Sequence, residues 1–589
     1  MVILLLVWLL LAVTSFCWGS ALMLLTIRPS TPRLEPSAFF ARLWCGIVMQ
    51  AGAALGLSLA GPVNAGRFLL LSLTICFTSC LSRRVRTDVR SALQYVRTTS
   101  RSGAIAALAL ATMTAWLFSQ APADIDTLLY HHQLTKWFAE FGAVQGLALI
   151  HERFGFLSST FTLAAPLESV LPGRSATAVN GFLLCVALTQ SFMMLARLRG
   201  NKSMAQTFFF IGVTGAIALH CALREPTGAS PDFAVSVVAI AAIWLLLGED
   251  GESETLVAAL VIACGLPLIK LSAAPAAIVI ALVALAKFRR RRQARQSVPL
   301  VVSALLFLAF VAVSLRVTGA LLFPLAATSI HVPWGVGADA TKRMALDVRD
   351  WARWNGPAPE NVRPSAWLGP WLRSGKGLLF CTLSAGNLLL LAWGAMKHFQ
   401  EGAKADKPWL LAATGLATSA YILAMAPNPR FGLGLLALGW FGLASLATQR
   451  LGERAREALP QWAPAPPTLA VVGVAAILAV VSFWPLDSWR RALNASSRQP
   501  FVAASAGHFN WLMPAQVPAI AFARRQSGGA SSTFPIHLAQ DKVDGFTYSY
   551  PINTDICGPA PLPASPRRLT HIALADPSRG LAGGFVTIP

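Results

Sequence analysis

Charged residues are scarce in this 589-residue sequence. Asp, Glu, Lys and Arg make up only 13% of its positions, whereas an ordinary soluble domain carries about a quarter. Hydrophobic residues make up 55%, and the mean hydropathy is +0.58. This composition excludes a typical soluble domain and predicts an all-α polytopic membrane protein.

Paired cysteines and internal repeats are also missing. No two of the nine cysteines have the C-x-x-C spacing, so the sequence supports neither a zinc site nor a disulfide framework. All except Cys557 lie in apolar segments, where Cys behaves as a small hydrophobe. No segment recurs with a fixed period, which excludes solenoid and propeller folds.

Long apolar runs fill most of the chain. A helix needs roughly 20 apolar residues to cross the hydrocarbon core, and on that scale the sequence contains about fourteen candidate spans. The first lacks a basic start and is too long for a signal-peptide core, so we interpret it as a retained span. The spans are predicted at 3–26, 39–60, 66–82, 103–120, 177–196, 205–222, 233–248, 254–269, 272–288, 298–316, 377–396, 409–426, 431–448 and 468–486.

Basic residues cluster in the short loops between these runs. The clusters at Arg83–Arg101, Arg197–Lys202, Lys287–Arg295, Lys397–Lys407 and Arg450–Arg456 all fall on one side of the predicted topology. The positive-inside rule makes that side cytoplasmic, and the acidic loop Glu249–Glu254 is a weak exception because acidic residues contribute little to orientation. We therefore expect an inner-membrane protein with both termini on the periplasmic side. The formal charge of +22 then needs no nucleic-acid partner.

Three regions follow from this layout. Residues 1–102 form N-terminal membrane helices and a basic loop. Residues 103–486 form a transmembrane core with outer loops at 121–176 and 317–376. Residues 487–589 are rich in Pro, Gly and Ser with short alternating runs, which predicts a small irregular or β-type extramembrane segment.

The densest polar chemistry lies in the first of those outer loops. Asp124, Asp126, His131, His132 and Arg153 lie close together in sequence, between strongly apolar segments. After Asp126, apolar side chains recur with helical spacing, which predicts a short amphipathic helix along the membrane surface.

Each polar residue of this loop has two interpretations. Asp126 is either a helix N-cap or an ionised, oriented general base. Its D-x-D spacing with Asp124 also allows the two carboxylates to hold a divalent cation such as Mg²⁺ or Mn²⁺. His131 and His132 either hydrogen-bond a sugar or phosphate, or are satisfied interfacial residues.

Three further polar residues fall on the predicted outer face. Asp232 begins a span and is either a helix cap or a site residue. Lys270 and Arg430 lie near outer helix ends, where they either snorkel or grip an anion such as a lipid diphosphate. Apart from Lys270, almost no ionisable residue lies near mid-span, which disfavours an ion-coupled transporter.

This layout resembles the GT-C superfamily of membrane glycosyltransferases. Members carry an acidic residue in an early outer loop ahead of an amphipathic helix, a second one in the next outer loop, and a Lys at the outer end of a later span. The matching positions are Asp124 or Asp126, Asp232 and Lys270. The spans before residue 103 would then be an N-terminal addition.

The chain more closely resembles a family of bacterial multi-pass membrane proteins whose chemistry is largely uncharacterised. The resemblance is carried by DTLLYHHQLTKWFAEFG, LIHERFGFLSS, TGALLFP followed by HVPW, APNPRFG, and CGPAPLP followed by GGF. Two positions depart from that pattern. Asn428 stands where an acidic residue is expected, and Ala564 where a second Cys would pair with Cys557.

The superfamily resemblance implies transfer of a sugar from a polyprenyl-phosphate-type donor to an envelope lipid or glycan on the non-cytoplasmic face. By the same resemblance, Asp126 would deprotonate the acceptor, and Lys270 and Arg430 would hold the phosphate. His131, His132 and Arg153 would line the sugar pocket. The alternatives are a non-enzymatic transporter or flippase of envelope lipid or glycan, and a surface-polysaccharide polymerase or ligase.

Overall fold

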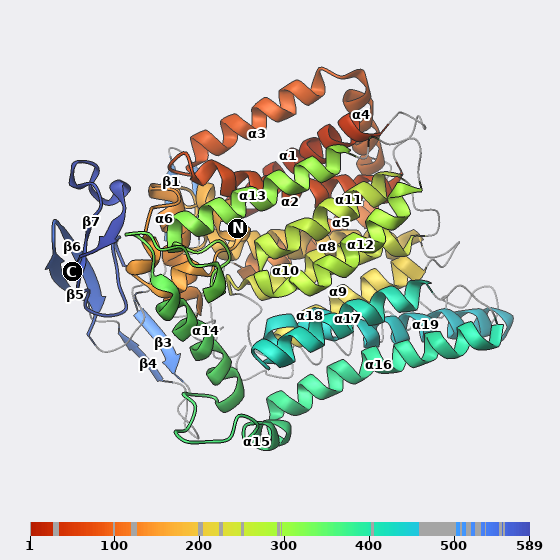
Figure 1. Ribbon diagram of the computed structural model, residues 1–589. Helices are drawn as coiled ribbons and strands as arrows, with labels where there is room; N and C mark the ends of the chain where they lie inside the picture. Colours follow the sequence, from red (N-terminus) through yellow and green to blue (C-terminus); the bar gives the residue numbers. More distant parts are fainter. Residues whose placement is uncertain are drawn as a thin grey trace.

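The protein is mostly helical, with a small strand region at its C-terminal end. The computed structural model describes residues 2–27, 35–97, 101–118, 126–197, 204–222, 228–248, 253–290, 295, 297–401, 406–458, 502–506, 509–513, 520–524, 532–535, 538–552, 557 and 560–588. The helices supply the body of the molecule, and the strands form hairpins at one end of it (Figure 1).

The helices follow the apolar runs of the sequence. They are α1 (Val2–Thr26), α2 (Pro36–Ser58), α3 (Ala65–Cys80), α4 (Arg83–Arg97), α5 (Arg101–Phe118), α6 (His132–Glu140), α7 (Ser159–Ala164), α8 (Ser175–Arg197), α9 (Met204–Ala222), α10 (Pro231–Leu247), α11 (Ser253–Ile269), α12 (Ala274–Arg289), α13 (Ser297–Thr318), α14 (Gly337–Trp354), α15 (Leu368–Arg373), α16 (Gly375–Glu401), α17 (Asp406–Met425), α18 (Leu433–Leu436) and α19 (Leu438–Ala458). Short turns that matter below are η1 (Thr127–His131), η3 (Glu152–Gly155), η5 (Leu271–Ala273), η7 (Pro429–Gly432) and η8 (Pro577–Gly583).

Every predicted span within the described ranges overlaps a helix, whereas 468–486 lies outside them. The predicted number is not confirmed. In the described part of the chain, eight helices are long and apolar enough to cross a membrane, or nine if the bent pair of α3 and α4 counts as one span. Apolar helices at Met204–His220, Pro231–Leu247 and Ser253–Ile269 are shorter.

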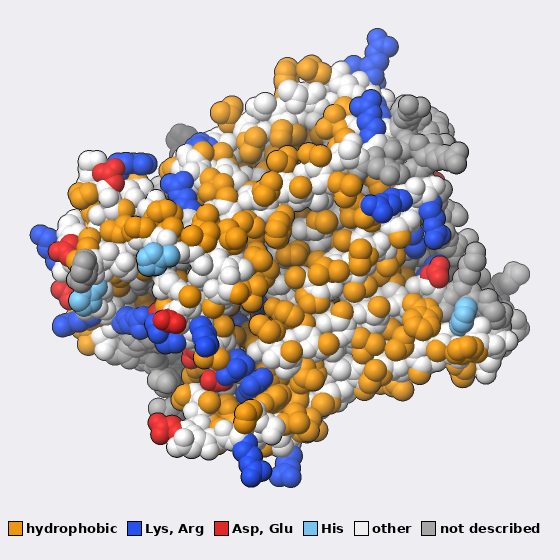
Figure 2. Space-filling view, viewed as in Figure 1, with side chains coloured by type: hydrophobic (Ala, Val, Ile, Leu, Met, Phe, Trp, Pro, Cys, Tyr) orange, Lys and Arg blue, Asp and Glu red, His pale blue; other side chains and the backbone are white. Residues whose placement is uncertain are grey.

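The long helices pack side by side in one bundle (Figure 1). The strands, α6 and α14 gather at one end, called here the strand-bearing end, and α4 lies at the opposite end; both chain termini lie toward the strand-bearing end. Figure 2 shows apolar side chains spread over the helical body and most charged ones toward its two ends. This distribution is expected of a bundle whose sides face hydrocarbon.

The C-terminal segment consists of antiparallel hairpins, as the sequence predicts. The pairs are β1 (Val502–Ala506) with β2 (Phe509–Met513), β3 (Ile520–Arg524) with β4 (Ser532–Pro535), β5 (Leu538–Val543) with β6 (Phe546–Pro551), and β7 (Ile572–Leu574) with β8 (Phe585–Thr587). Cys557 packs with Ala560 and Ala564 in one small buried cluster. Ala564, which replaces the expected second Cys, therefore lies beside Cys557.

The GGF motif docks this segment onto the first outer loop. Gly584 has φ +91°, and a Cβ there would lie 2.6 Å from the carbonyl oxygen of Gln145, so only glycine fits. The next residue, Phe585, donates its N–H to that same carbonyl at 2.9 Å. Its ring is fully buried and meets Trp137 of α6 edge-on at 5.9 Å.

This docking corrects the predicted surface helix. The amphipathic segment folds as η1 followed by α6, but nearly all of its side chains are buried, including His132, Gln133 and Trp137. The Gln133 side chain donates to the carbonyl of Ala560 at 2.9 Å, so the C-terminal segment covers the face that would otherwise meet the membrane surface. The helical spacing of apolar residues in a sequence indicates that one face of the helix makes apolar contacts. It does not indicate whether lipid or protein provides those contacts.

An ion network at the opposite end gives a structural role to Glu254, the last residue of the acidic loop. Glu254 opens α11 and pairs with Arg42 of α2 at 2.8 Å and with Arg84 of α4 at 3.2 Å. Arg42 also pairs with Asp88 of α4 at 2.5 Å and is only 3% exposed. Glu254 is therefore a structural counter-ion for the basic end of the bundle.

We predict that Phe585→Ala loosens the C-terminal segment from the bundle. Truncation of a fully buried Phe removes its contacts and leaves a cavity, with a loss of roughly 3–5 kcal/mol. Hydrogen exchange across residues 538–588 is expected to accelerate, together with tryptic cleavage at Arg567 and Arg568.

The matched control is Phe399→Ala, which removes the same atoms from a side chain that is 86% exposed. This variant is expected to leave the exchange of residues 538–588 unchanged. Equal exchange in both variants would show that Phe585 does not hold the segment.

Candidate functional site

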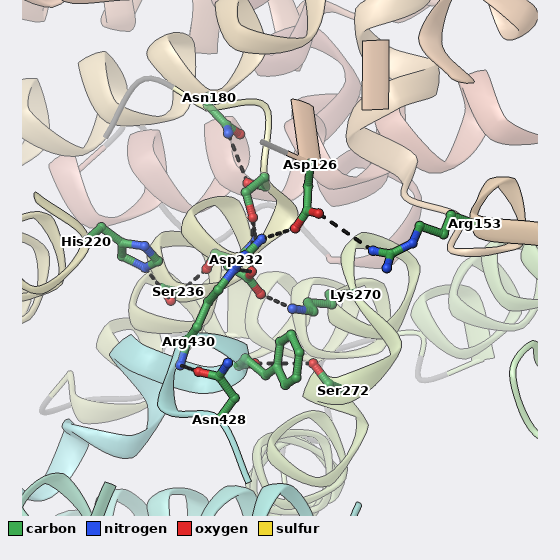
Figure 3. Close-up of polar contacts among 12 residues, drawn as sticks. Asp126, Arg153, Asn180, His220, Asp232, Ser236, Lys270, Ser272, Asn428 and Arg430 are labelled. Atoms are coloured by element: carbon green, nitrogen blue, oxygen red, sulfur yellow. Dashed lines mark hydrogen bonds and ion pairs between the residues drawn. The ribbon is translucent and has the colours of Figure 1, made fainter. Parts of the chain in front are cut away.

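Two carboxylates and three cations meet at the strand-bearing end (Figure 3). Asp126 precedes η1, Arg153 lies in η3, Asp232 in the first turn of α10, Lys270 between α11 and η5, and Arg430 in η7. These five residues, the charged cluster, come from segments far apart in sequence. Together they carry one positive charge in excess.

Asp232 is the most deeply buried member of the charged cluster. Its side chain is 3% exposed and pairs with Lys270 and, at 3.3 Å, with Nε of Arg430. The N-cap of α10 is Ser230, whose hydroxyl accepts from the backbone N–H of Asp232 and also donates to its carboxylate at 3.0 Å. The cap interpretation of Asp232 is therefore wrong, because Ser230 caps the helix.

The turn that carries Arg430 is fixed on both sides. Asn428 caps η7 by accepting from the backbone N–H of Arg430 at 3.2 Å, a role that an aspartate would also serve. Trp371 of α15 donates its indole N–H to the carbonyl of Pro427 at 2.7 Å. The ammonium of Lys270 lies 4.6 Å from the ring centre of Phe431, a cation–π contact beside its ion pair.

Asp126 stands ahead of its helix but makes no capping hydrogen bond with its side chain. Its carboxylate instead pairs with Arg430 and lies 3.7 Å from Arg153. Burial raises the pKa of Asp126, but the charges of Arg430 and Arg153 oppose it and lower the pKa to about 2. Asp126 is therefore ionised at neutral pH and is a weak base while Arg430 holds it.

Arg153 is the most exposed member of the charged cluster. Asp126, Lys270 and Arg430 are 16%, 21% and 22% exposed, and Arg153 is 29% exposed. Arg153 also lies 3.9 Å from Asp347 of α14, which is 46% exposed. Solvent thus reaches the charged cluster from the side that α14 borders.

The two predicted histidines face different ways. The ring of His131 packs on Tyr130 and Phe161 and lies within electrostatic range of the charged cluster. The charge that acts on His132 is instead that of Lys136, one helical turn further along α6. Burial lowers the pKa of His131 to about 3 and that of His132 to about 4, so both rings are neutral at pH 7.

Sequence reasoning missed the polar residues that support the charged cluster. His220 of α9 lies 3.4 Å from the hydroxyl of Ser236, which donates to the backbone carbonyl of Asp232 at 2.8 Å. Asn180 of α8 donates to the carbonyls of Gly228 and Ser230 at 2.9 and 3.0 Å. A polar side chain near the end of an apolar run was the only available signal, and it is shared by many residues that serve no site.

Of the two carboxylates predicted to hold a metal, the structure describes Asp126, whereas Asp124 lies outside the described residues. Among those that are described, no three His, Cys, Asp or Glu side chains gather as metal ligands. The oxygens of Asp126 and Asp232 face cations, which repel a divalent ion. The described donor set therefore does not fit Mg²⁺ or Mn²⁺.

A family model described as a domain of unknown function, DUF8201, matches residues 1–437. The chain belongs to the DUF8201 family. The match contains the whole charged cluster and also the helices before residue 103, whereas the C-terminal strands lie beyond the residues that the DUF8201 model covers. Comparison with curated proteins and with solved structures gave no match.

We predict that the charged cluster behaves as a coupled unit in unfolding experiments. Lys270→Met should lower the free energy of unfolding in detergent by about 3 kcal/mol, because it removes one partner of a buried carboxylate. The double variant Asp232→Asn with Lys270→Met should recover part of that loss, since no buried charge is then left short of a partner.

Lys342→Met is the matched control, because Lys342 is an exposed lysine of α14, and a change within about 0.5 kcal/mol is expected. Strict additivity of the Asp232 and Lys270 single substitutions would contradict the coupling.

A second prediction concerns pH. His132 stays neutral in the folded protein down to about pH 4, whereas the unfolded chain takes up a proton near pH 6.5. Stability is therefore fully present above pH 6.5 and declines as pH falls toward 4. His132→Asn should remove on the order of 1–2 kcal/mol of the stability change between pH 7 and 5.

The measurement is the melting temperature as a function of pH. His331→Asn, at an exposed position, should keep the slope of the unsubstituted protein. An unchanged slope in His132→Asn would refute the assignment.

Proposed function

We propose that this protein is a membrane glycosyltransferase. It moves a sugar from a polyprenyl-phosphate-type donor to an envelope lipid or glycan acceptor on the non-cytoplasmic face. One observation supports the proposal above all: Asp126 faces Arg430, which with Lys270 also holds Asp232, at one end of a bundle of apolar helices. A carboxylate beside cations is the pairing that transfer from a phosphate ester requires.

The cations match the leaving group. When the bond between the anomeric carbon and the phosphate oxygen breaks, negative charge develops on that oxygen. In this proposal, Lys270 and Arg430 stabilise that charge by charge-assisted hydrogen bonds. The excess positive charge of the charged cluster favours an anionic ligand of this kind.

The carboxylate matches the acceptor. Asp126 takes the proton of the acceptor hydroxyl while the acceptor oxygen forms its bond to the anomeric carbon. The pKa of Asp126, about 2, is low mainly because the positive charge of Arg430 stabilises the carboxylate. A phosphate that draws Arg430 away would raise the pKa of Asp126 and strengthen it as a base, so donor binding itself prepares the base.

The position of the charged cluster matches a lipid-linked donor. Lys270 follows α11 directly and Arg430 follows α17 by a short turn, so both lie at the ends of apolar helices. A phosphate at headgroup depth reaches such a position while its hydrocarbon tail stays in the bilayer.

The test is Asp126→Asn, which keeps the size of the side chain and removes its charge. Turnover with a polyprenyl-phosphate sugar is expected to fall by 10²- to 10⁴-fold, as for loss of a general base. Donor binding is expected to persist or tighten, because Arg430 is released for the phosphate. Sugar transfer and binding of a non-transferable donor analogue are measured separately.

Arg430→Gln should show the opposite pattern, with donor-analogue binding weakened at least tenfold. Asp339→Asn, at an exposed position of α14, serves as the control for turnover. Wild-type glycan transfer by Asp126→Asn would refute the proposal.

A further inference from the structure

The junction of α3 and α4 lies at the end of the bundle opposite the charged cluster (Figure 1). The two helices meet at an angle of 103°. The chain enters α3 at the strand-bearing end, where Val63 donates its N–H to the carbonyl of Phe138. It leaves α3 at the other end and turns sideways.

One face of α3 is exposed and has none of the described residues packed over it. Its exposed apolar side chains are Leu70, Leu73, Phe77 and, just past the helix, Leu81, with exposed fractions of 70%, 53%, 69% and 63%. Their spacing of three and four residues places them in one row along the helix. In a membrane, such a row faces lipid. α4 begins where this row ends.

α3 is also short for a span. Its 16 residues measure about 24 Å at 1.5 Å per residue, against a hydrocarbon core of about 30 Å. The mismatch draws the residues that follow α3 toward the headgroups. Arg86 of α4 meanwhile donates to the carbonyls of Cys80 and Leu81 at 2.8 Å and fixes the corner.

The exposed face of α4 is a row of guanidinium groups. At about 100° per residue, Arg83, Arg86, Arg90 and Arg97 fall within an arc of about 60°. All four are exposed. The opposite face holds the buried Val85 and Ala92 and the ion-paired Arg84 and Asp88.

We propose that α4 binds the headgroups of anionic phospholipids in the leaflet opposite the charged cluster. The arginine row supplies charge and bidentate donors for phosphate, and Leu93, 54% exposed at the edge of the same face, reaches the acyl region. A bilayer is favoured over nucleic acid or an acidic protein, because α4 begins two residues after Leu81, where the exposed apolar row of α3 ends. The predicted topology makes this the cytoplasmic leaflet.

The test uses the full-length protein in neutral detergent, titrated with dioleoyl-phosphatidylglycerol or dioleoyl-phosphatidylcholine while its melting temperature is recorded. Only the anionic lipid is expected to raise the melting temperature, and 0.5 M salt is expected to weaken the effect. Arg83→Gln, Arg90→Gln and Arg97→Gln together should raise the half-saturating concentration about 100-fold, since each basic residue near an anionic surface contributes about fivefold.

The matched control removes the same charge from exposed residues of the outer loop, with Lys342→Gln, Arg343→Gln and Arg363→Gln, and should respond as wild type. Arg83→Lys, Arg90→Lys and Arg97→Lys together should retain most of the response, which would show that the corner still folds. An equal response of the glutamine triple variant and the wild type would overturn the proposal, as would an equal loss in the control. Neither outcome depends on the activity of the charged cluster.

Discussion

An ionised side chain inside an apolar bundle loses its favourable interactions with water. Ion pairs and hydrogen bonds from protein groups must compensate for that loss of free energy. Asp232 is almost fully buried, and Lys270, Arg430 and Ser230 provide this compensation. The backbone segments that carry Lys270, Arg430 and Ser230 must therefore all bring these residues into contact with the Asp232 carboxylate. Much of the local structure serves that requirement: Asn428 fixes the turn of Arg430, Asn180 holds the loop before α10, and Ser236 ties the first turn of α10 to α9.

Asp126 adds a second carboxylate to the same cations and connects them to the outer loops. Arg153 reaches from Asp126 to α14, and η1 and α6, which follow Asp126, are covered by the C-terminal strands. The cations of the charged cluster are thus already paired with its two carboxylates, and its most exposed member, Arg153, lies on the side of α14. An anion bound on that side would compete with the carboxylates of Asp126 and Asp232 for the same cations. Because the carboxylates already orient those cations, their side chains would need to move little to bind the anion.

The sequence predicts the helices well because a run of apolar residues is a local property. It also picks out Asp126, Asp232, Lys270 and Arg430, since a charge at the end of an apolar run must have a partner. It does not show which residue is the partner, because the paired residues lie in different segments of the chain, such as Asp126 and Arg430, which are 304 positions apart. The burial of α6 and the role of Glu254 were likewise beyond prediction, because each depends on a segment distant in the chain. His220 and Asn180 carry only the weak local signal of a polar side chain near the end of an apolar run.

The helix α11 is held by ions at both ends. Glu254 in its first turn is locked to Arg42 and Arg84, and Lys270, the residue after its last turn, is locked to Asp232. These ion pairs oppose both rotation and sliding of α11. A shift by one residue would move each end by about 1.5 Å and turn it by about 100°, which would separate the paired groups. The position of the Lys270 ammonium group at one end of the bundle therefore depends on the guanidinium groups of Arg42 and Arg84 at the other end, and loss of the ion pairs at either end would displace the whole helix.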